Sequence, residues 1–317
     1  MKRALTLLAA IAATHASAQG WPAKPIRAIV PVSAGSSTDI VHRLVLEQLS
    51  ARLGQQIVVD NRVGAGGTIG SAAVAASPPN GYTILAHGSA HTIAPALYKT
   101  LPYDPARDFA AVAMIGVSPV VLVVAPAKGF KTAGDLVAAA KARPSALNFS
   151  SVGIGSATHL CAERFVSSTA VQAVHIPFKG GAEAMTEVIA GRADFFFGPV
   201  ALVLPHIREG RLTALAVNTE KRSPALPHVP TLREAGIHDA EYPIWFALFV
   251  PAGTPREIVE RLNRQALGAL QAPKVREKLA ALGVDQMPMS PADFSAYVER
   301  EVALNTALAQ RAGLKAE

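Results

Sequence analysis

The chain repeats one local pattern several times: an apolar strand-like run leads into a turn of glycine and hydroxyl residues, and then into a helix-like run. In the first copy the apolar run is 26–31, the turn is Ser33–Asp39, and apolar residues recur at three- and four-residue spacing over 40–53. Strands that alternate with helices are typical of parallel sheets covered by helices. The pattern predicts an α/β protein whose turns suit a negatively charged group, because helix N-termini present free backbone N–H groups.

The first residues are organised like an export signal. Lys2 and Arg3 precede a short apolar run, 5–13, and Ala16-Ser17-Ala18 fits the small-x-small rule, which places the cleavage after Ala18. The alternative is an uncleaved anchor, but the apolar run is short for a bilayer. We therefore expect the mature protein to be exported.

Charge and cysteine content narrow the classes of partner. The formal net charge is +7, and Lys2 and Arg3 carry two of these charges, so the exported chain keeps +5. This excess favours anionic ligands. Nucleic acid is not expected as a partner, because there is no dense run of Lys and Arg and aromatic residues are only 6%. A single cysteine, Cys161, excludes an intrachain disulfide.

The repeated pattern forms two units, which predicts a bilobed fold of two doubly wound α/β domains. The apolar runs 117–125 and 242–250 are interpreted as the segments that cross between the units. The C-terminal helices, which begin at Thr254-Pro255 and Ser290-Pro291, return to the first unit. The predicted limits are 1–18 for the signal peptide, 19–122 plus 247–317 for the first domain and 123–246 for the second.

Five turns are expected at the carboxyl ends of the strands, where open α/β sheets bind ligands. They share glycine or hydroxyl residues and are 33–39, 64–70, 87–91, 153–159 and 179–181. They supply many N–H and hydroxyl donors and few acceptors, which suits a carboxylate or another oxyanion. One such turn alone could serve only a tight bend, but five in register on two lobes indicate a binding site.

Three other chemistries are weaker interpretations. The run 64–70 has the spacing G-x-G-x-x-x-G and no acidic residue after the next strand, which disfavours a dinucleotide. His87, His91, His159 and His175 lack a carboxylate or cysteine that would complete a compact metal site. A hydrolase would need Ser36, Ser89 or Ser156 as nucleophile, with His91 or His159 as base and Asp39 to orient it, but there is no G-x-S-x-G motif. We expect no cofactor, no metal and no catalysis.

Two residues have competing interpretations. Asp39 falls in the first turn of its helix, where a carboxylate accepts N–H groups of the turn, so a structural role is favoured over ligand contact. Trp245 belongs either to the core or to the wall of the cleft.

An ordered series of short motifs resembles the Bug family of periplasmic solute-binding proteins, the extracytoplasmic receptors of tripartite tricarboxylate transporters. The resemblance covers essentially the whole mature chain. The motifs are PVSAGSSTD (31–39), DNRVGAGG (60–67), PNGYT (79–83), LPYDP (101–105), HIPFKGG (175–181), KRSPALP (221–227) and PAGTP (251–255).

The resemblance implies a type II periplasmic-binding-protein (Venus flytrap) fold, a small organic anion as ligand, and membrane transporter subunits as partners of a monomer in the periplasm. It implies that first-lobe turns, with bridging waters, bind one carboxylate and second-lobe loops contact the rest of the ligand. The expected ligand-binding residues are Ser33, Ala34, Gly35, Ser36, Ser37, Asp39, Gly66, Gly67, Ser89, His91, Gly153, Ser156, Thr158, His159, Lys179, Gly180, Gly181, Gly198 and Trp245.

The chain departs from the family pattern at two places. Ser36 replaces the second glycine of the A-G-G-x-T-D turn, and Gly198-Pro199 replaces an Asp-Asn pair. Without that aspartate a ligand ammonium lacks a partner, so we expect a carboxylate without a free amine: a di- or tricarboxylate or an aromatic acid. A sensor that presents the closed receptor to a signalling partner is the alternative function, and a serine hydrolase is another.

Overall fold

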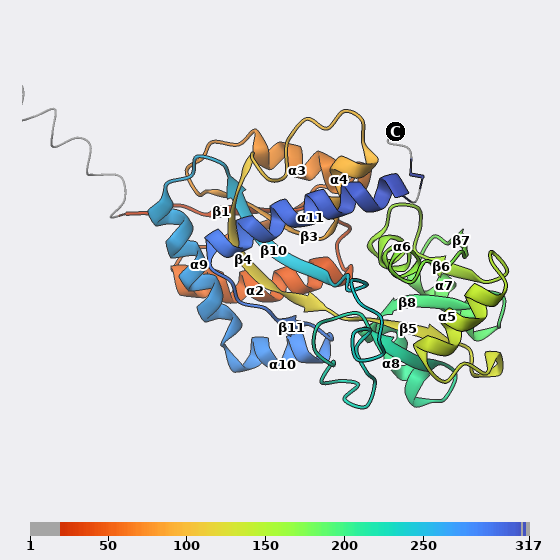
Figure 1. The fold of residues 1–317 in the computed structure, drawn as a ribbon. Coiled ribbons are helices and arrows are strands. Elements are labelled where there is room, and N and C mark those ends of the chain that lie inside the picture. Colours follow the sequence, from red (N-terminus) through yellow and green to blue (C-terminus); the bar gives the residue numbers. More distant parts are fainter. Residues whose placement is uncertain (1–19, 312, 315–317) are drawn as a thin grey trace, which may run out of the picture.

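The computed structural model describes residues 20–311, 313 and 314, and the proposed signal peptide lies outside them. Two sheets form the framework of two lobes (Figure 1). The first sheet has the strand order β11-β4-β10-β3-β1-β2. Its strands are β1 (Ile26–Val30), β2 (Ile57–Asn61), β3 (Thr83–Gly88), β4 (Phe109–Ser118), β10 (Ile244–Pro251) and β11 (Asp285–Gln286).

The second sheet has the order β7-β6-β8-β5-β9. Its strands are β5 (Val120–Val124), β6 (Asn148–Ser151), β7 (Val174–Pro177), β8 (Phe195–Pro199) and β9 (Thr213–Val217). Both sheets are mixed. β1 pairs in parallel with β2 and β3, which confirms the predicted βαβαβ unit, whereas β10 is antiparallel to β3 and β4, and β5 is antiparallel to β8 and β9.

Helices cover both faces of the first sheet. One face packs against α2 (Ser37–Leu53) and α9 (Arg256–Leu270), and α10 (Pro273–Ala281) contacts both of these helices. The other face packs against α3 (Thr68–Ala75), α4 (Ala90–Leu97) and α11 (Pro291–Arg311) (Figure 1). The apolar positions predicted for the first helix, Val41, Leu44, Val45, Leu49 and Leu53, are all buried in this core.

The second lobe is built in the same way. One face of its sheet packs against α5 (Ala133–Ala142) and α6 (Ala157–Thr169), and the other against α7 (Gly181–Ile189) and α8 (Val200–Arg208). Thr132 caps α5, because its hydroxyl accepts a hydrogen bond from the backbone N–H of Asp135. Two short 3-10 turns, η1 (Ala65–Gly67) and η2 (Pro126–Lys128), complete the chain described.

The run 117–125, interpreted as one crossing segment, is not a single element. The run is divided at Pro119 into β4 and β5, which belong to different sheets. Proline cannot donate to a strand ladder, so it favours a break at this position. The neighbouring N–H, that of Val120, donates instead to the Asn218 side chain (2.9 Å), whose amide also donates to the carbonyl of Tyr242. Asn218 thus joins the two segments that cross between the lobes.

The helices α4 and α8 are among those missing from the sequence prediction. Residues 87–91 were expected to form a polar loop, but β3 runs to Gly88 and α4 begins at Ala90. Similarly, α8 begins at Val200, directly after β8. α4 contains Pro95 and α8 contains Pro205. A proline inside a segment argues against predicting a helix from sequence. These two helix starts prove important for the site.

The start of α9 also differs from expectation. Thr254 does not cap this helix: its hydroxyl donates to the carbonyl of Pro251 (2.7 Å), and Pro255 is the N-cap residue.

Over the described part of the chain, no helix combines the length and the apolar character that crossing a membrane requires. The predicted domain limits stay a prediction. The chain passes from the first sheet to the second at Pro119 and returns to the first within 218–243.

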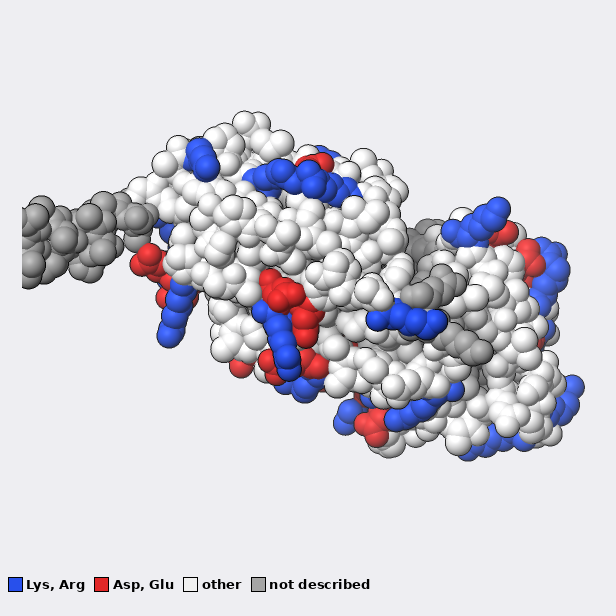
Figure 2. Space-filling view, turned by 90° about the horizontal axis from the view of Figure 1, so that it is seen from above, with Lys and Arg blue, Asp and Glu red and all other residues white. Residues whose placement is uncertain are grey.

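On the face drawn in Figure 2, the charged residues form no large area of a single sign. Lys and Arg side chains are scattered there and often stand beside Asp or Glu, with wide uncharged areas between them. That face shows no continuous basic stripe of the kind that follows a nucleic-acid backbone.

Candidate functional site

A pocket of about 260 Å³ lies between the two lobes. Residues of both sheets, of the crossing segments and of the C-terminal part form its walls: Val32, Ser37, Thr38, Val41, His87, Gly88, Ser89, Ala90, Ser118, Ala157, Pro199, Ala201, Ile244, Trp245, Phe246, Leu282 and Val284. The ends of β3 and β8 reach this pocket through Gly88 and Pro199. It therefore occupies the position at which open α/β sheets bind ligands.

Four helices begin at this pocket. The first lobe contributes Ser37 and Thr38 of α2 and Ala90 of α4, and the second contributes Ala157 of α6 and Ala201 of α8. A helix N-terminus carries roughly half a positive charge and unpaired N–H donors. No Asp, Glu, Lys or Arg is among the lining residues. The pocket therefore offers helix ends and hydroxyls, rather than cationic side chains, as groups that could bind an anion.

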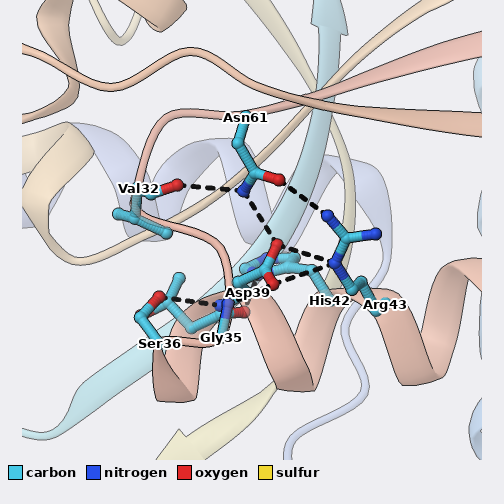
Figure 3. Close-up of polar contacts among 8 residues, drawn as sticks. Val32, Gly35, Ser36, Asp39, His42, Arg43 and Asn61 are labelled. Carbon is cyan, nitrogen blue, oxygen red and sulfur yellow. Dashed lines mark hydrogen bonds and ion pairs between the residues drawn. The ribbon is translucent and has the colours of Figure 1, made fainter.

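The first turn is held by a buried carboxylate (Figure 3). Asp39 accepts hydrogen bonds from the backbone N–H of Gly35 (2.8 Å), from the Asn61 side-chain amide (2.9 Å) and from Arg43 Nε (3.0 and 2.9 Å). Burial raises the pKa of Asp39, but the hydrogen bonds from Asn61, Gly35 and Arg43 outweigh burial and lower it. All of these contacts are internal, which supports the structural interpretation of Asp39.

Ser36 is the N-cap residue of α2, and its hydroxyl accepts a hydrogen bond from the backbone N–H of Asp39 (3.3 Å). This supplies a reason for a serine at a family glycine position, because Ser is a favoured N-cap. Ser33, Ala34 and Gly35 form the exposed part of the same turn. The sequence prediction placed these residues correctly around a helix N-terminus.

The second glycine turn lies beside a buried histidine. Gly66 and Gly67 adopt positive φ angles of 65° and 97° within η1. A Cβ on Gly67 would come within 2.8 Å of His87 Nε2, so only glycine fits there without displacement. Neither glycine lines the pocket itself, but Gly67 contacts a residue that does.

His91 belongs to the core behind the pocket. Its ring packs against Tyr103, Phe109 and Phe249, and its Nε2 lies 3.2 Å from the carbonyl oxygen of Pro105. Burial lowers the pKa of His91 to about 4. Ser89, by contrast, lines the pocket, and its hydroxyl accepts a hydrogen bond from the backbone N–H of Trp245 (2.8 Å).

The second-lobe turn 153–159 forms a hydrogen-bonded cap for α6. The Ser156 hydroxyl donates to the carbonyl of Gly153 (2.7 Å) and accepts from the backbone N–H of His159 (3.3 Å). The Thr158 hydroxyl accepts from the N–H of Val152 (3.1 Å). These residues position the N-terminus of α6, of which Ala157 is the lining residue.

Other expected residues lie farther from the pocket or deeper in the core. Lys179, Gly180 and Gly181 surround the N-terminus of α7 and are not lining residues. Gly198 is buried in β8, opposite Val121. Trp245 lines the pocket, yet its ring is fully buried in the core and its Nε1 donates to Glu301 (3.4 Å).

The described residues give no support to the serine and histidine pairs considered for a hydrolase. The hydroxyls of Ser89 and Ser156 bond to backbone groups, as described above, and His159 Nδ1 accepts from the N–H of Gly155 (3.0 Å). A close serine–histidine contact does occur elsewhere, between Ser151 Oγ and His175 Nε2 (2.6 Å), but Ser151 is fully buried.

The sequence prediction missed several lining residues. Ala201 was hidden because α8 was not predicted, and Pro199 was named only for its departure from the family pattern. Leu282 and Val284 follow α10 in the C-terminal part, and only the return of this part to the lobes brings them to the pocket. Periodicity within a segment carries no signal for such long-range contacts.

A larger hollow of about 1020 Å³ lies between the segment 219–243 and the C-terminal elements. It shares Val284 with the pocket but is otherwise lined by different residues, including charges of both signs such as Lys221, Arg276, Glu277 and Glu301. No single ligand charge is favoured there. The smaller pocket, with its four helix N-termini, is therefore the candidate ligand site.

Comparison with known proteins agrees with this architecture. The model of the tripartite tricarboxylate transporter family receptor, TctC, matches residues 41–314. The protein BugT of Bordetella pertussis is 36% identical over 305 residues, which cover 96% of this chain and 94% of BugT. These matches confirm the resemblance to the Bug family.

Two solved structures combine this fold with a bound acid. A protein of R. palustris with adipate is 34% identical, with a TM-score of 0.77, and the match covers 92% of this chain and 98% of that protein. MatC of Rhodopseudomonas palustris with bound malate is 30% identical, with a TM-score of 0.74, over 91% of this chain and all of MatC. The chain therefore belongs to the TctC family of tripartite tricarboxylate transporter receptors.

Proposed function

We propose that this receptor captures a small carboxylate without a free amine in the pocket between its lobes and delivers it to the subunits of a membrane transporter. The observation that carries the proposal is the convergence of four helix N-termini on one small pocket. Two of these helices come from each lobe, so a ligand with a carboxylate at each end would contact both lobes. The adipate and malate bound to the two structural relatives are acids of this kind.

The lining residues argue against an amino acid as ligand. A buried ammonium group loses its water and needs an anionic or carbonyl partner. No Asp or Glu lines the pocket, and Gly198 and Pro199 stand at the end of β8 where the family pattern has an acidic residue. The positive ends of four helices would also repel an ammonium group.

Delivery to a transporter requires the receptor to work outside the cytoplasm. We propose that residues 1–18 are removed after Ala18 during export and that the mature receptor acts in the periplasm as a monomer. Binding and release are sufficient for this role, and no covalent step is needed. Closure of the lobes around the ligand would present the transporter with a surface that the open form lacks.

A thermal-shift screen with paired acids tests the ligand class. Malate and aspartate have the same carbon skeleton and differ in a hydroxyl or an amino group, as glutarate and glutamate differ in an added amine. We expect malate or glutarate to raise Tm, because a ligand that binds only the native state stabilises it, by about 4 kcal/mol at a thousandfold excess over Kd. Aspartate and glutamate should leave Tm unchanged.

Adipate, citrate and nicotinate extend the screen to longer, tribasic and aromatic acids. A shift with aspartate or glutamate as large as that with the matched amine-free acid would contradict the proposed ligand class. No shift with any acid would contradict carboxylate capture altogether.

A further inference from the structure

Among the described residues that line the pocket, His87 is the only histidine, the residue type whose unperturbed side chain ionises near neutral pH. It stands near the end of β3, with 2% of its surface exposed. His87 lies between two parts of the first lobe that were predicted to bind the ligand, the Gly67 turn and Ser89. The ring reaches the Gly67 turn, and the following residues, Gly88 and Ser89, continue the pocket wall toward α4.

The imidazole of His87 has an unused buried nitrogen. The described residues offer no hydrogen-bond partner to Nδ1, although this atom is buried. Buried polar atoms in folded proteins normally have a partner, and the exceptions often mark a site that a ligand or water completes. This observation is independent of the helix N-termini, and it concerns a residue that lines the same pocket.

The groups around His87 are mainly other histidines. On α4, the ring of His91 lies 5.9 Å from that of His87, with Asp104 beyond it. On α2, His42 has its ring nitrogens 2.7 Å from the Thr38 carbonyl oxygen and 3.1 Å from that of Ala247, and the carboxylate of Asp39 on the same helix is bound to Gly35, Arg43 and Asn61.

The remaining neighbours carry no charge. Ala247 of β10 pairs with His87, and the Gly67 turn approaches its ring. Burial, followed by the neighbouring His91 and His42, holds the pKa of His87 well below its usual range. Without a bound anion, the neutral form of His87 is therefore favoured.

We propose that His87 binds a proton from the solvent when a carboxylate enters the pocket, so that the receptor takes up anion and proton together. This inference rests on the proposed function. Without a bound anion, the charged form of His87 is disfavoured, because the side chain is buried away from water and stands near helix N-termini. A bound carboxylate reverses the local field and supplies the negative charge that an imidazolium requires.

The pH dependence of affinity follows from this coupling. A histidine whose pKa rises on binding favours the complex at low pH, and this gain is lost as the pH rises through the pKa of the complex. With one linked proton, the Kd for malate should fall by up to about tenfold for each unit of decreasing pH in that range. Between pH 6.5 and 8 malate itself is fully ionised, so the dependence would report the protein.

Isothermal titration of malate and glutarate in two buffers tests the proposal. Bis-Tris and imidazole, both at pH 7, differ in ionisation enthalpy, and the difference in observed heat gives the number of protons taken up. We expect uptake of up to one proton per malate or glutarate for the unaltered protein, and none for His87→Asn. His238→Asn changes an exposed histidine that does not line the pocket, and it should match the unaltered protein.

Nuclear magnetic resonance of the histidine rings locates the proton without relying on the variant's stability. The His87 Cε1–H signal should shift toward the imidazolium position when malate is added at pH 7. Binding with no proton uptake, or with equal uptake in His87→Asn, would overturn the inference and leave the proposed function intact. Failure of every acid in the screen to bind would instead overturn the proposed function, and this inference with it.

Discussion

The Ala201→Asp variant is expected to lose binding of malate and glutarate, with an affinity at least about 100-fold weaker. Ala201 is an exposed residue in the first turn of α8 and lines the pocket. A carboxylate there would compete with the ligand for the same helix N-terminus and would repel it. Like charges brought together at an interface cost several kcal/mol, and each 1.4 kcal/mol is a factor of about ten in Kd.

The fold should tolerate this change. An aspartate in the first turn of a helix is favoured by the helix dipole, and α8 has no acidic residue in its first turn. Gly67→Asp would be a poorer test, because Gly67 has a positive φ and a side chain there would meet His87. A loss of affinity at Gly67 could then reflect strain in the turn.

Ala292→Asp provides the matched control. Ala292 is also an exposed alanine at the second residue of a helix, α11, but it does not line the pocket. Both variants should unfold at temperatures close to that of the unaltered protein, and only Ala201→Asp should lose the titration signal with malate. Equal affinities for the two variants would show that the N-terminus of α8 does not contact the ligand.

Asp39→Ala should destabilise the protein by about 2–4 kcal/mol, since the change removes the acceptor shared by Gly35, Arg43 and Asn61. Breaking a fully buried ion pair costs more, but the Arg43 side chain is 46% exposed and regains water when its partner is lost. The N-terminal turn of α2 should also loosen, so malate affinity should fall. Urea unfolding and calorimetric titration measure the two effects.

The pH dependence of this stabilisation has a definite sign. The pKa of Asp39 is lower in the folded protein, so its contribution is fully present above the pKa of an unfolded aspartate, about 3.9, and is lost as the pH falls through the folded value. The difference in unfolding free energy between the unaltered protein and Asp39→Ala should thus be constant from pH 6 to 8 and shrink below about pH 4.

Asp135→Ala is the control for Asp39→Ala. Asp135 also accepts N–H groups at the start of a helix, α5, but it is exposed, and no described residue is a cationic partner within ion-pair distance. Its loss of stability should be clearly smaller than that of Asp39→Ala. Equal losses would mean that the network around Asp39 adds nothing beyond an ordinary helix cap.

Local pattern predicted the first βαβαβ unit well because each signal lies within one element. The apolar spacing of α2 is an example, and it is confirmed. The prediction failed where a proline had two possible meanings. Pro119 separates strands of different sheets, whereas Pro95 and Pro205 lie inside helices that tolerate them.

The site was predicted as a set of turns, and the structure shows helix N-termini as the shared feature of its walls. Ser37 and Ser89 were named and do line the pocket, and Ser156 caps a helix that reaches it. Ala201 was not named because nothing in an alanine indicates an anion site. Its importance comes from its place at the start of α8, which depends on the fold of the second lobe.

The same helix ends that attract an anion have a second consequence when no anion is present. Four partial positive charges, two on each lobe, then face a common space, and like charges repel. We expect this repulsion to oppose closure of the empty receptor, so that the ligand's own charge supplies the attraction that draws the lobes together. Loaded and empty receptors would then differ in outline, and a transporter that reads the closed outline would seldom engage an empty one.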